Sequence, residues 1–280
     1  MSNIVDAILN IVNSQSLPNR SSSNNRANQM GEALENYVKD IFAGTQEETD
    51  ESKRIQKISQ TFCYLGNQNN PPDSMLKNGG DAIEVKKIEQ VSSALALNSS
   101  YPKSKLYSDS TLINKACREC ESWEVRDMLY VVGVVNDGRM SALSLIYGED
   151  YCASRDVYEK IKTKIKEGII TIPDVEFSET KELGRVNRVD PLGITYLRIR
   201  GMWHIENPFE VFKEIFKIDS SKEFNFRAII STEKKNKLTN FCRLVELAEN
   251  NPNFDISDVK IQEPNNPAHL KDAVLISFSI

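Results

Sequence analysis

Two carboxylates and a lysine occur close together in residues 71–89, on either side of an Asn-Gly pair at positions 78–79. An Asn-Gly pair between two short apolar runs favours a tight β-hairpin. Side chains alternate between the two faces of a strand, so Glu84 and Lys86 point to the same side. The turn can bring the carboxylate of Asp73 close to that of Glu84. This arrangement predicts a site for a hard divalent cation with a positively charged side chain beside it.

The same residue types fit metal-assisted attack of water on a phosphodiester. A divalent metal neutralises the charge of the phosphate, holds it and acidifies a bound water. Mg²⁺ prefers oxygen ligands and retains several waters, so Asp73 and Glu84 can suffice, with the backbone carbonyl of Val85 as a further ligand. Lys86 can orient the attacking water, assist its deprotonation or stabilise the transition state. The sequence leaves these three roles open.

Two neighbouring residues are weaker candidates for the same site. Asp81 projects to the face opposite Glu84 in a regular strand, but a bulge at 79–80 would let it replace Asp73 as the first metal ligand. Lys87 projects to the side opposite the candidate catalytic lysine, so we expect a structural role for it.

The hairpin resembles the PD-(D/E)xK nuclease superfamily, with Pro72-Asp73 as the first half of the motif and Glu84-Val85-Lys86 as the second. Longer segments are similar to type II restriction endonucleases of the NgoPII family, namely residues 28–44, 69–89, 94–106 and 185–208. The resemblance implies an α/β fold with a PD-(D/E)xK restriction-endonuclease-like core, in which helices flank a mixed central β-sheet. It also implies an Mg²⁺-dependent homodimer that cuts double-stranded DNA at the palindrome GGCC.

The superfamily suggests a further residue for the site. In that superfamily a helix before the hairpin often contributes a supporting glutamate, and the pattern Gly31-x-x-x-Glu35 places Glu35 at the matching position. The resemblance therefore implies that Glu35 is a supporting metal ligand. An ordinary surface ion pair is the alternative.

The composition fits an enzyme with a cleft rather than a protein that coats nucleic acid. Of the 280 residues 40% are hydrophobic, which is enough for a sizeable core, and the net charge is −5. Acidic residues are dense in 40–51 and basic residues in 185–200, as expected for a basic cleft within an acidic surface. The chain has no apolar run long enough for a membrane span and its start lacks a basic leader, so we expect a cytoplasmic location.

The five cysteines are expected to be reduced thiols. Cys117 and Cys120 form one C-x-x-C pair, but no second pair or nearby histidine completes a zinc site. The two histidines, His204 and His269, are too scattered for a histidine-based metal centre.

The chain is expected to change character near residue 170. Residues 1–170 are predicted to form the catalytic nuclease core with an N-terminal helical segment, and residues 171–280 the DNA-recognition and C-terminal region, packed on the same domain. Besides the hairpin, the patterns predict helices at 1–12, 30–43, 51–65, 109–123, 154–168, 208–216 and 233–249, of which 51–65 becomes extended near Cys63. They also predict strands at 128–135, 141–147, 195–205, 224–231 and 272–280, a polar loop at 16–29 and an irregular stretch at 171–190.

Four arginines are the candidates for base recognition: Arg185, Arg188, Arg198 and Arg200. The planar fork of arginine matches O6 and N7 of guanine in the major groove. A strand that presents Arg198 and Arg200 on one exposed face would therefore suit a GC-rich target. The alternative is a solvent-facing strand on which these arginines pair with Glu182 or Asp190.

Residues outside the arginine group are candidates for contacts with the DNA backbone. Lys103 and Lys105 follow the catalytic strand and could act as backbone clamps, with an ordinary polar loop as the alternative. Trp203 and His204 are candidates for packing against sugar or phosphate.

These features predict a type II restriction endonuclease that cuts both strands of a short GC-rich palindrome in double-stranded DNA. A two-fold symmetric target calls for a homodimer with one active site per subunit. A restriction role implies a cognate DNA methyltransferase in the same system, without direct contact, and no membrane partner. The alternatives are a repair or recombination nuclease that recognises DNA structure, and a non-catalytic DNA-binding protein.

Overall fold

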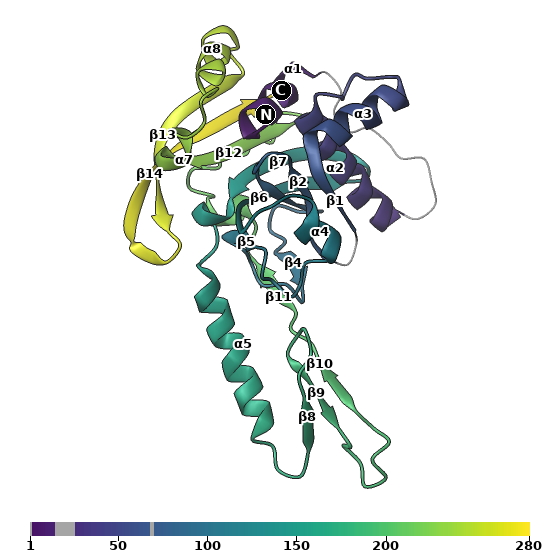
Figure 1. Ribbon diagram of the computed structural model, residues 1–280. Helices are drawn as coiled ribbons and strands as arrows, with labels where there is room; N and C mark the ends of the chain where they lie inside the picture. Colours follow the sequence, from purple (N-terminus) through teal and green to yellow (C-terminus); the bar gives the residue numbers. More distant parts are fainter. Residues whose placement is uncertain (1, 15–25, 68–69) are drawn as a thin grey trace.

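A mixed nine-stranded β-sheet forms the centre of the molecule, and helices cover both of its faces (Figure 1). The computed structural model describes residues 2–14, 26–67 and 70–280, and within 26–30 it describes the backbone alone. The strand order is β1-β2-β3-β6-β7-β12-β14-β13, and β5 pairs with β6 off this path. The strands are β1 (Phe62–Asn67), β2 (Asn70–Leu76), β3 (Ala82–Ile88), β5 (Lys105–Tyr107), β6 (Val125–Asn136), β7 (Arg139–Tyr147), β12 (Asn225–Ser231), β13 (Phe254–Glu263) and β14 (Asn266–Ser279). This confirms the predicted α/β architecture.

One face of the sheet is covered by four helices, α1 (Ile4–Asn13), α2 (Arg26–Ala43), α3 (Glu51–Thr61) and α8 (Cys242–Asn250). The first of them begins at a capping box, in which Asn3 accepts from backbone N–H groups of the first turn and Asp6 accepts from the N–H of Asn3. Its apolar residues Ile4, Ile8 and Ile11 recur at helical spacing and are buried, because that face packs on the sheet.

The other face is covered by short elements and by aromatic side chains. It carries α4 (Lys115–Glu119), α6 (Pro208–Val211) and the two-stranded sheet of β4 (Leu95–Asn98) and β11 (Trp203–Ile205). Because both faces are covered, residues 128–135 of β6 are buried almost throughout. This explains the absence of alternation in that stretch.

The C-terminal third of the chain completes the same sheet. Strand β12 runs parallel to β7, with Phe226 opposite Leu143, and antiparallel to β14. The short helix α7 (Thr232–Lys235) follows β12 directly, and the 3-10 turn of Gly148–Asp150 follows β7. Strands from both sides of residue 170 therefore share one hydrophobic core.

A long arm projects from one end of the core (Figure 1). It consists of α5 (Arg155–Ile170) and a three-stranded sheet of β8 (Glu176–Ser178), β9 (Gly184–Asn187) and β10 (Leu197–Ile199). At its base, the rings of Tyr101 and Tyr158 stack at 5.5 Å, and Trp203 meets Tyr158 edge-on at 5.8 Å. These aromatic contacts attach the arm to the core, and they occupy Trp203, which the sequence suggested for DNA contact.

Several predicted elements differ from the structure. The helix expected at 109–123 is confined to Lys115–Glu119, because Asn114 supplies its N-cap. The strand expected at 195–205 is divided into β10 and β11, and the helix expected at 233–249 is divided into α7 and α8. The irregular stretch 171–190 contains β8 and β9.

Other parts of the chain are described only in part or were not predicted at all. Strand β13 had no counterpart among the sequence predictions. Most of the loop expected at 16–29 lies outside the described residues, and its last residues belong to α2. Within the described part of the chain, all five cysteines are free thiols, and no helix is long and apolar enough to cross a membrane.

Candidate active site

The hairpin of β2 and β3 forms as the sequence predicts. The central turn residues Asn78 and Gly79 both have positive φ, 58° and 77°, the conformation that Asn-Gly favours in a tight turn. The carboxylate of Glu121 accepts from both of their N–H groups, at 2.8 and 3.2 Å. The buried guanidinium of Arg126 pairs with Glu121 at 2.6 Å and donates to two backbone carbonyls beside the turn. Sequence reasoning missed this ion pair, because its members are distant from the hairpin in sequence.

The register of the hairpin places Asp73 beside Glu84. Ser74 pairs with Ile83, so the preceding residue of β2 faces the following residue of β3. The Oδ2 atom of Asp73 accepts from the N–H of Val85 at 2.6 Å, which holds the carboxylate against β3. The hairpin thus brings the two predicted acids together.

Glu84 has one paired and one unpaired carboxylate oxygen. Its Oε1 lies 2.6 Å from Nζ of Lys86, on the same face of β3. Its Oε2 is buried and has no hydrogen-bond partner. A buried carboxylate oxygen without a partner carries a desolvation cost that a bound cation would relieve.

Burial and mutual repulsion alter the proton affinity of these groups. Burial, and the nearby charge of Glu84, raise the pKa of the Asp73 carboxyl to about 7. Burial alone would lower the pKa of Lys86, but the carboxylates of Glu84 and Asp73 raise it above its usual value. The site therefore has an excess of negative charge that favours a second cation beside the Lys86 ammonium.

Glu35 approaches this group from α2. Burial raises the pKa of its carboxyl, while Lys39 and Lys86 lower it. Its electrostatic coupling to Lys86 and Glu84 places it near the hairpin site rather than on a remote surface.

Asp81 belongs to a different cluster. Its carboxylate accepts from the Tyr147 hydroxyl at 2.9 Å and lies 3.5 Å from the ammonium of Lys234, which also pairs with Asp127. The carboxylate is fully occupied by these partners. Of the two candidates for the first ligand, Asp73 is therefore the one beside Glu84.

A cavity of about 700 Å³ connects the hairpin site to the arm. Asp73, Glu84 and Lys86 are among the residues that line it. The arm contributes Lys181, Glu182, Arg198, Arg200 and Met202, and the segment after β3 contributes Asn98, Ser99 and Ser100. The catalytic candidates and two of the four recognition candidates thus face one space.

The two arginines of this cavity share one carboxylate. Nη2 of Arg198 lies 3.5 Å from Glu182, and Nε of Arg200 lies 3.0 Å from its other oxygen. About half of each arginine side chain is exposed, whereas Glu182 is largely buried. This is the pairing that the sequence left open as an alternative, and it presents both arginines to the cavity.

The other two arginines lie along the arm. The guanidinium of Arg185 stacks on the ring of Tyr196 at 3.7 Å, and Arg188 pairs with Glu176 at 3.4 Å. Neither of them lines the cavity that contains the hairpin site. Asp190 stabilises its own turn by accepting from nearby backbone N–H groups, rather than orienting an arginine.

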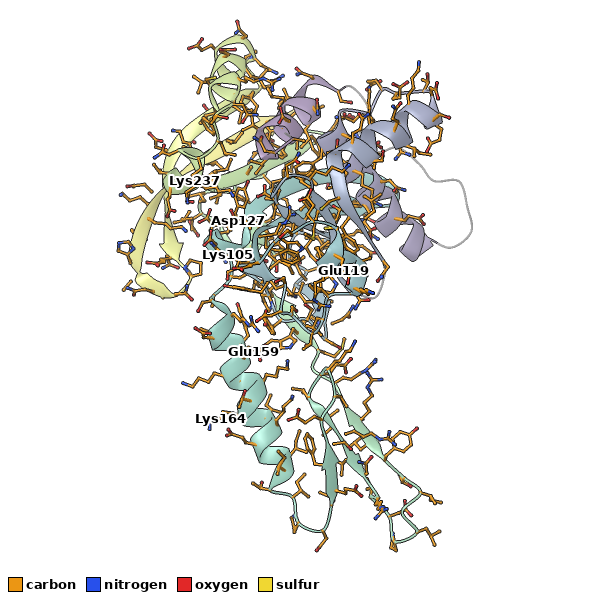
Figure 2. All side chains as sticks on the ribbon, viewed as in Figure 1. Lys105, Glu119, Asp127, Glu159, Lys164 and Lys237 are labelled. Atoms are coloured by element: carbon orange, nitrogen blue, oxygen red, sulfur yellow. The ribbon has the colours of Figure 1, made fainter. Side chains whose placement is uncertain are left out.

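The two candidate backbone clamps do not line the cavity. Lys103 is buried, its ammonium donates to the Ser100 hydroxyl, and burial lowers its pKa to about 8. This position does not fit an exposed clamp, and the chain folds inward there because the Lys103 N–H donates to the Tyr130 hydroxyl at 2.7 Å. Lys105 lies 3.6 Å from Asp127 (Figure 2) and 2.9 Å from Glu149.

The residues at the hairpin fit a hard cation with few protein ligands. Among residues 2–14, 31–67 and 70–280, no group of three or more His, Cys, Asp or Glu side chains is placed to hold a metal. Two carboxylates are nevertheless compatible with Mg²⁺, which keeps several waters. The unpaired Oε2 of Glu84 is the feature of this site that most directly calls for a cation.

Comparison with known proteins finds relatives over nearly the whole chain. The model of the NgoPII restriction endonuclease family matches residues 2–262. The type II restriction enzyme NgoPII of Neisseria gonorrhoeae is 53% identical over 281 residues, which cover 99% of this chain and 100% of that protein. No solved structure matches the chain significantly.

Proposed function

The chain belongs to the NgoPII restriction endonuclease family, and from this premise we propose that it cuts double-stranded DNA with Mg²⁺ at the palindrome GGCC. Family membership makes it a type II restriction endonuclease, and this excludes the non-catalytic protein and the structure-directed repair nuclease. The observation that best supports the catalytic proposal is the cavity shared by Asp73, Glu84, Lys86 and the arm arginines.

Asp73 and Glu84 would hold the metal, with the Val85 carbonyl as a further ligand and Glu35 in support. When bound, Mg²⁺ would neutralise the scissile phosphate and acidify a water. The N–H of Val85 fixes the Asp73 carboxylate before any ligand arrives, because it donates to Oδ2. Preorganisation of this kind lowers the cost of assembling the site on DNA.

Lys86 would act through its positive charge. In the metal-free site the carboxylates of Glu84 and Asp73 raise the pKa of Lys86, so its side chain is protonated at neutral pH before a metal binds. A protonated Lys86 beside Glu84 can donate a hydrogen bond to the phosphate and stabilise the charge that develops in the transition state. Of the three roles left open by the sequence, this one fits the electrostatics.

Arg198 and Arg200 would supply base recognition. Their exposed guanidinium groups project into the cavity, where both now pair with the Glu182 carboxylate. A guanine that displaced this carboxylate would leave the planar fork of each arginine free to donate to O6 and N7. GGCC offers guanines on both strands within four base pairs. Residues 171–280 would then carry recognition and residues 1–170 catalysis, with Arg185 and Arg188 in contact with flanking phosphates.

The biological setting follows from this activity. A palindromic target calls for a homodimer, and protection of the host genome calls for a cognate methyltransferase that need not touch this chain. The enzyme would act in the cytoplasm, where incoming DNA is met.

Substitutions at the hairpin test the catalytic assignment. We expect Asp73→Asn, Glu84→Gln and Lys86→Met each to lower the cleavage rate by about 10³-fold or more while binding of a GGCC duplex in Ca²⁺ persists. Lys87→Met is the matched control, because Lys87 pairs with Glu89 on the other face of the strand. Near-wild-type cleavage by any of the three variants would remove that residue from the assignment.

Sequencing the ends of digested phage DNA tests the recognition site. We expect all ends to derive from GGCC. Ends from a different single sequence would refute GGCC and leave the catalytic assignment intact, whereas ends without a common sequence would refute site-specific cutting.

A further inference from the structure

The arm carries an unusual amount of exposed apolar surface. Of the nineteen large hydrophobic side chains that are exposed among the described residues, eleven lie between residues 155 and 202. They are Val157, Ile161, Ile165, Ile170, Ile172, Val189, Leu192, Ile194, Tyr196, Leu197 and Met202. Monomeric proteins rarely expose contiguous apolar patches larger than a few hundred Å². The concentration of exposed apolar side chains in this one part of the molecule makes the arm the best candidate for a docking surface.

Helix α5 shows the pattern most clearly. It has no buried residue along its sixteen positions. Val157, Ile161 and Ile165 follow one another at intervals of four residues, so they lie on one face of the helix, and they are 48%, 49% and 41% exposed. Isolated helices of this length are marginal in water, which indicates that packing against another surface stabilises α5.

The charged residues of α5 do not cover this face. Glu159 and Lys164, both labelled in Figure 2, pair with Lys162 and Glu167, respectively. Each pair is satisfied within the helix, so these side chains need no external partner of opposite charge. The apolar stripe of Val157, Ile161 and Ile165 stays exposed beside these pairs.

The arm is held to the core rather than loosely attached. Tyr158 on α5 contacts both Tyr101 and Trp203 at the base, and Met202, beside Trp203, lines the active-site cavity. The base of the arm is therefore fixed beside the cavity. A partner that docks on the arm would be positioned relative to the catalytic residues.

We propose that the arm, residues 155–202, is the surface on which a second copy of this chain docks. This inference rests on the proposed function, which calls for a two-fold symmetric enzyme but does not say which surface joins the subunits. The eleven side chains, each 41% to 80% exposed, present on the order of 1,000 Å², comparable with the roughly 800 Å² that each partner buries in a standard interface.

DNA is a poorer candidate for this surface. Protein–DNA interfaces are polar and strongly basic, whereas the stripe on α5 consists of valine and isoleucine. The arginines that suit DNA lie instead on β10 and at its end, where they face the cavity. No residue of the α5 stripe lines the cavity, so an arm–arm contact through that stripe would leave the cavity free for DNA.

Charged substitutions on the stripe test the proposal. We expect the wild-type protein to sediment as a dimer at micromolar concentration, and Ile161→Glu and Ile165→Glu each to weaken the dimer at least about tenfold, because a carboxylate would be buried in an apolar interface. The matched control is Ile55→Glu, since Ile55 lies on helix α3, outside the arm, and is 57% exposed. It should sediment like the wild type. Circular dichroism checks that each variant is folded.

Plasmid cleavage provides a second measurement. If the arm joins the subunits, Ile161→Glu at low concentration should accumulate nicked circles, while wild type and Ile55→Glu should give linear DNA. Two arm variants that dimerise as tightly as the wild type, or a wild-type chain that stays monomeric on DNA, would overturn the proposed interface. A wild type that dimerises through the arm but never cuts DNA would instead overturn the proposed nuclease activity.

Discussion

At the scale of single residues, the candidate active site places like charges side by side, and a bound cation would relieve their repulsion. Asp73 and Glu84 lie side by side in a buried setting. The single positive charge of Lys86 balances only one of their two negative charges. Such an arrangement lowers the stability of the metal-free protein. The same repulsion favours metal binding, so stability and function oppose each other at this point.

The cost of the Asp73 charge should be measurable in the metal-free enzyme. Burial and the nearby charge of Glu84 raise the pKa of Asp73 from its ordinary value of 3.8 to about 7. The group therefore contributes most to stability below pH 4, and this contribution is lost as the pH rises through 7. Asp73→Asn keeps a neutral acceptor for the Val85 N–H. We therefore expect it to match the wild type in EDTA at pH 4, and to be more stable by about 1–3 kcal/mol at pH 8 in urea unfolding.

The control for this prediction is the exposed Asp255 on β13. Asp255→Asn should leave the free energy of unfolding unchanged at both pH values. Added Mg²⁺ at pH 8 should stabilise the wild type and not Asp73→Asn. An Asp73→Asn protein less stable than the wild type at pH 8 would show that the carboxylate is not under repulsion.

At the scale of elements, the hairpin could be predicted because its signals are local. The Asn-Gly turn and the alternation around Glu84 lie within one short stretch, and the register follows from them. Strand β13 was missed because much of it is exposed and polar, with Asp258 and Lys260 among its residues. In the arm, β8 and β9 are only three and four residues long, too short for a periodic pattern to identify them. No Gly or Pro marks the break between α7 and α8.

Only the central part of the site could be predicted, because only its residues lie close together in the sequence. Asp73, Glu84 and Lys86 are connected by one turn, whereas Glu121 and Glu182 reach the hairpin and the arginines through tertiary packing. The inward course of Lys103 depends on the Tyr130 hydroxyl. Contacts between distant segments of this kind leave no spacing pattern in a single sequence.

The turn of the hairpin should depend on Glu121. Glu121→Ala would leave the buried guanidinium of Arg126 without its carboxylate and two turn N–H groups without their acceptor. We expect a loss of about 1–3 kcal/mol in the free energy of unfolding at pH 7 and a lower cleavage rate. Glu119→Ala is the control, because Glu119 (Figure 2) forms an exposed pair with Lys115 at 3.8 Å and should change stability by less than about 0.5 kcal/mol. Equal effects of the two variants would contradict this role.

At the scale of the whole molecule, the core needs strands from both ends of the sequence, whereas the arm is formed by one continuous segment, residues 155–202. The core is closed by strands from both ends of the sequence, because β12 pairs with β7 and Phe226 and Ala228 are buried between layers. Lys234, after β12, also contacts Asp81 beside the hairpin turn. The arm contacts the core chiefly at its aromatic base.

This difference predicts opposite results for two deletions. Replacing residues 159–202 with a short Gly-Ser linker should leave a core that unfolds in one cooperative transition, since the rings of Tyr158 and Trp203 at the two ends are 5.8 Å apart. The product should bind DNA weakly and cut no specific site, because Arg198 and Arg200 are gone. A fragment of residues 1–170 should instead fail to fold cooperatively, because β7 loses its neighbour β12 and the core loses Phe226. Calorimetry would detect both results, and a cooperative transition in the fragment would show that the core is independent of the C-terminal strands.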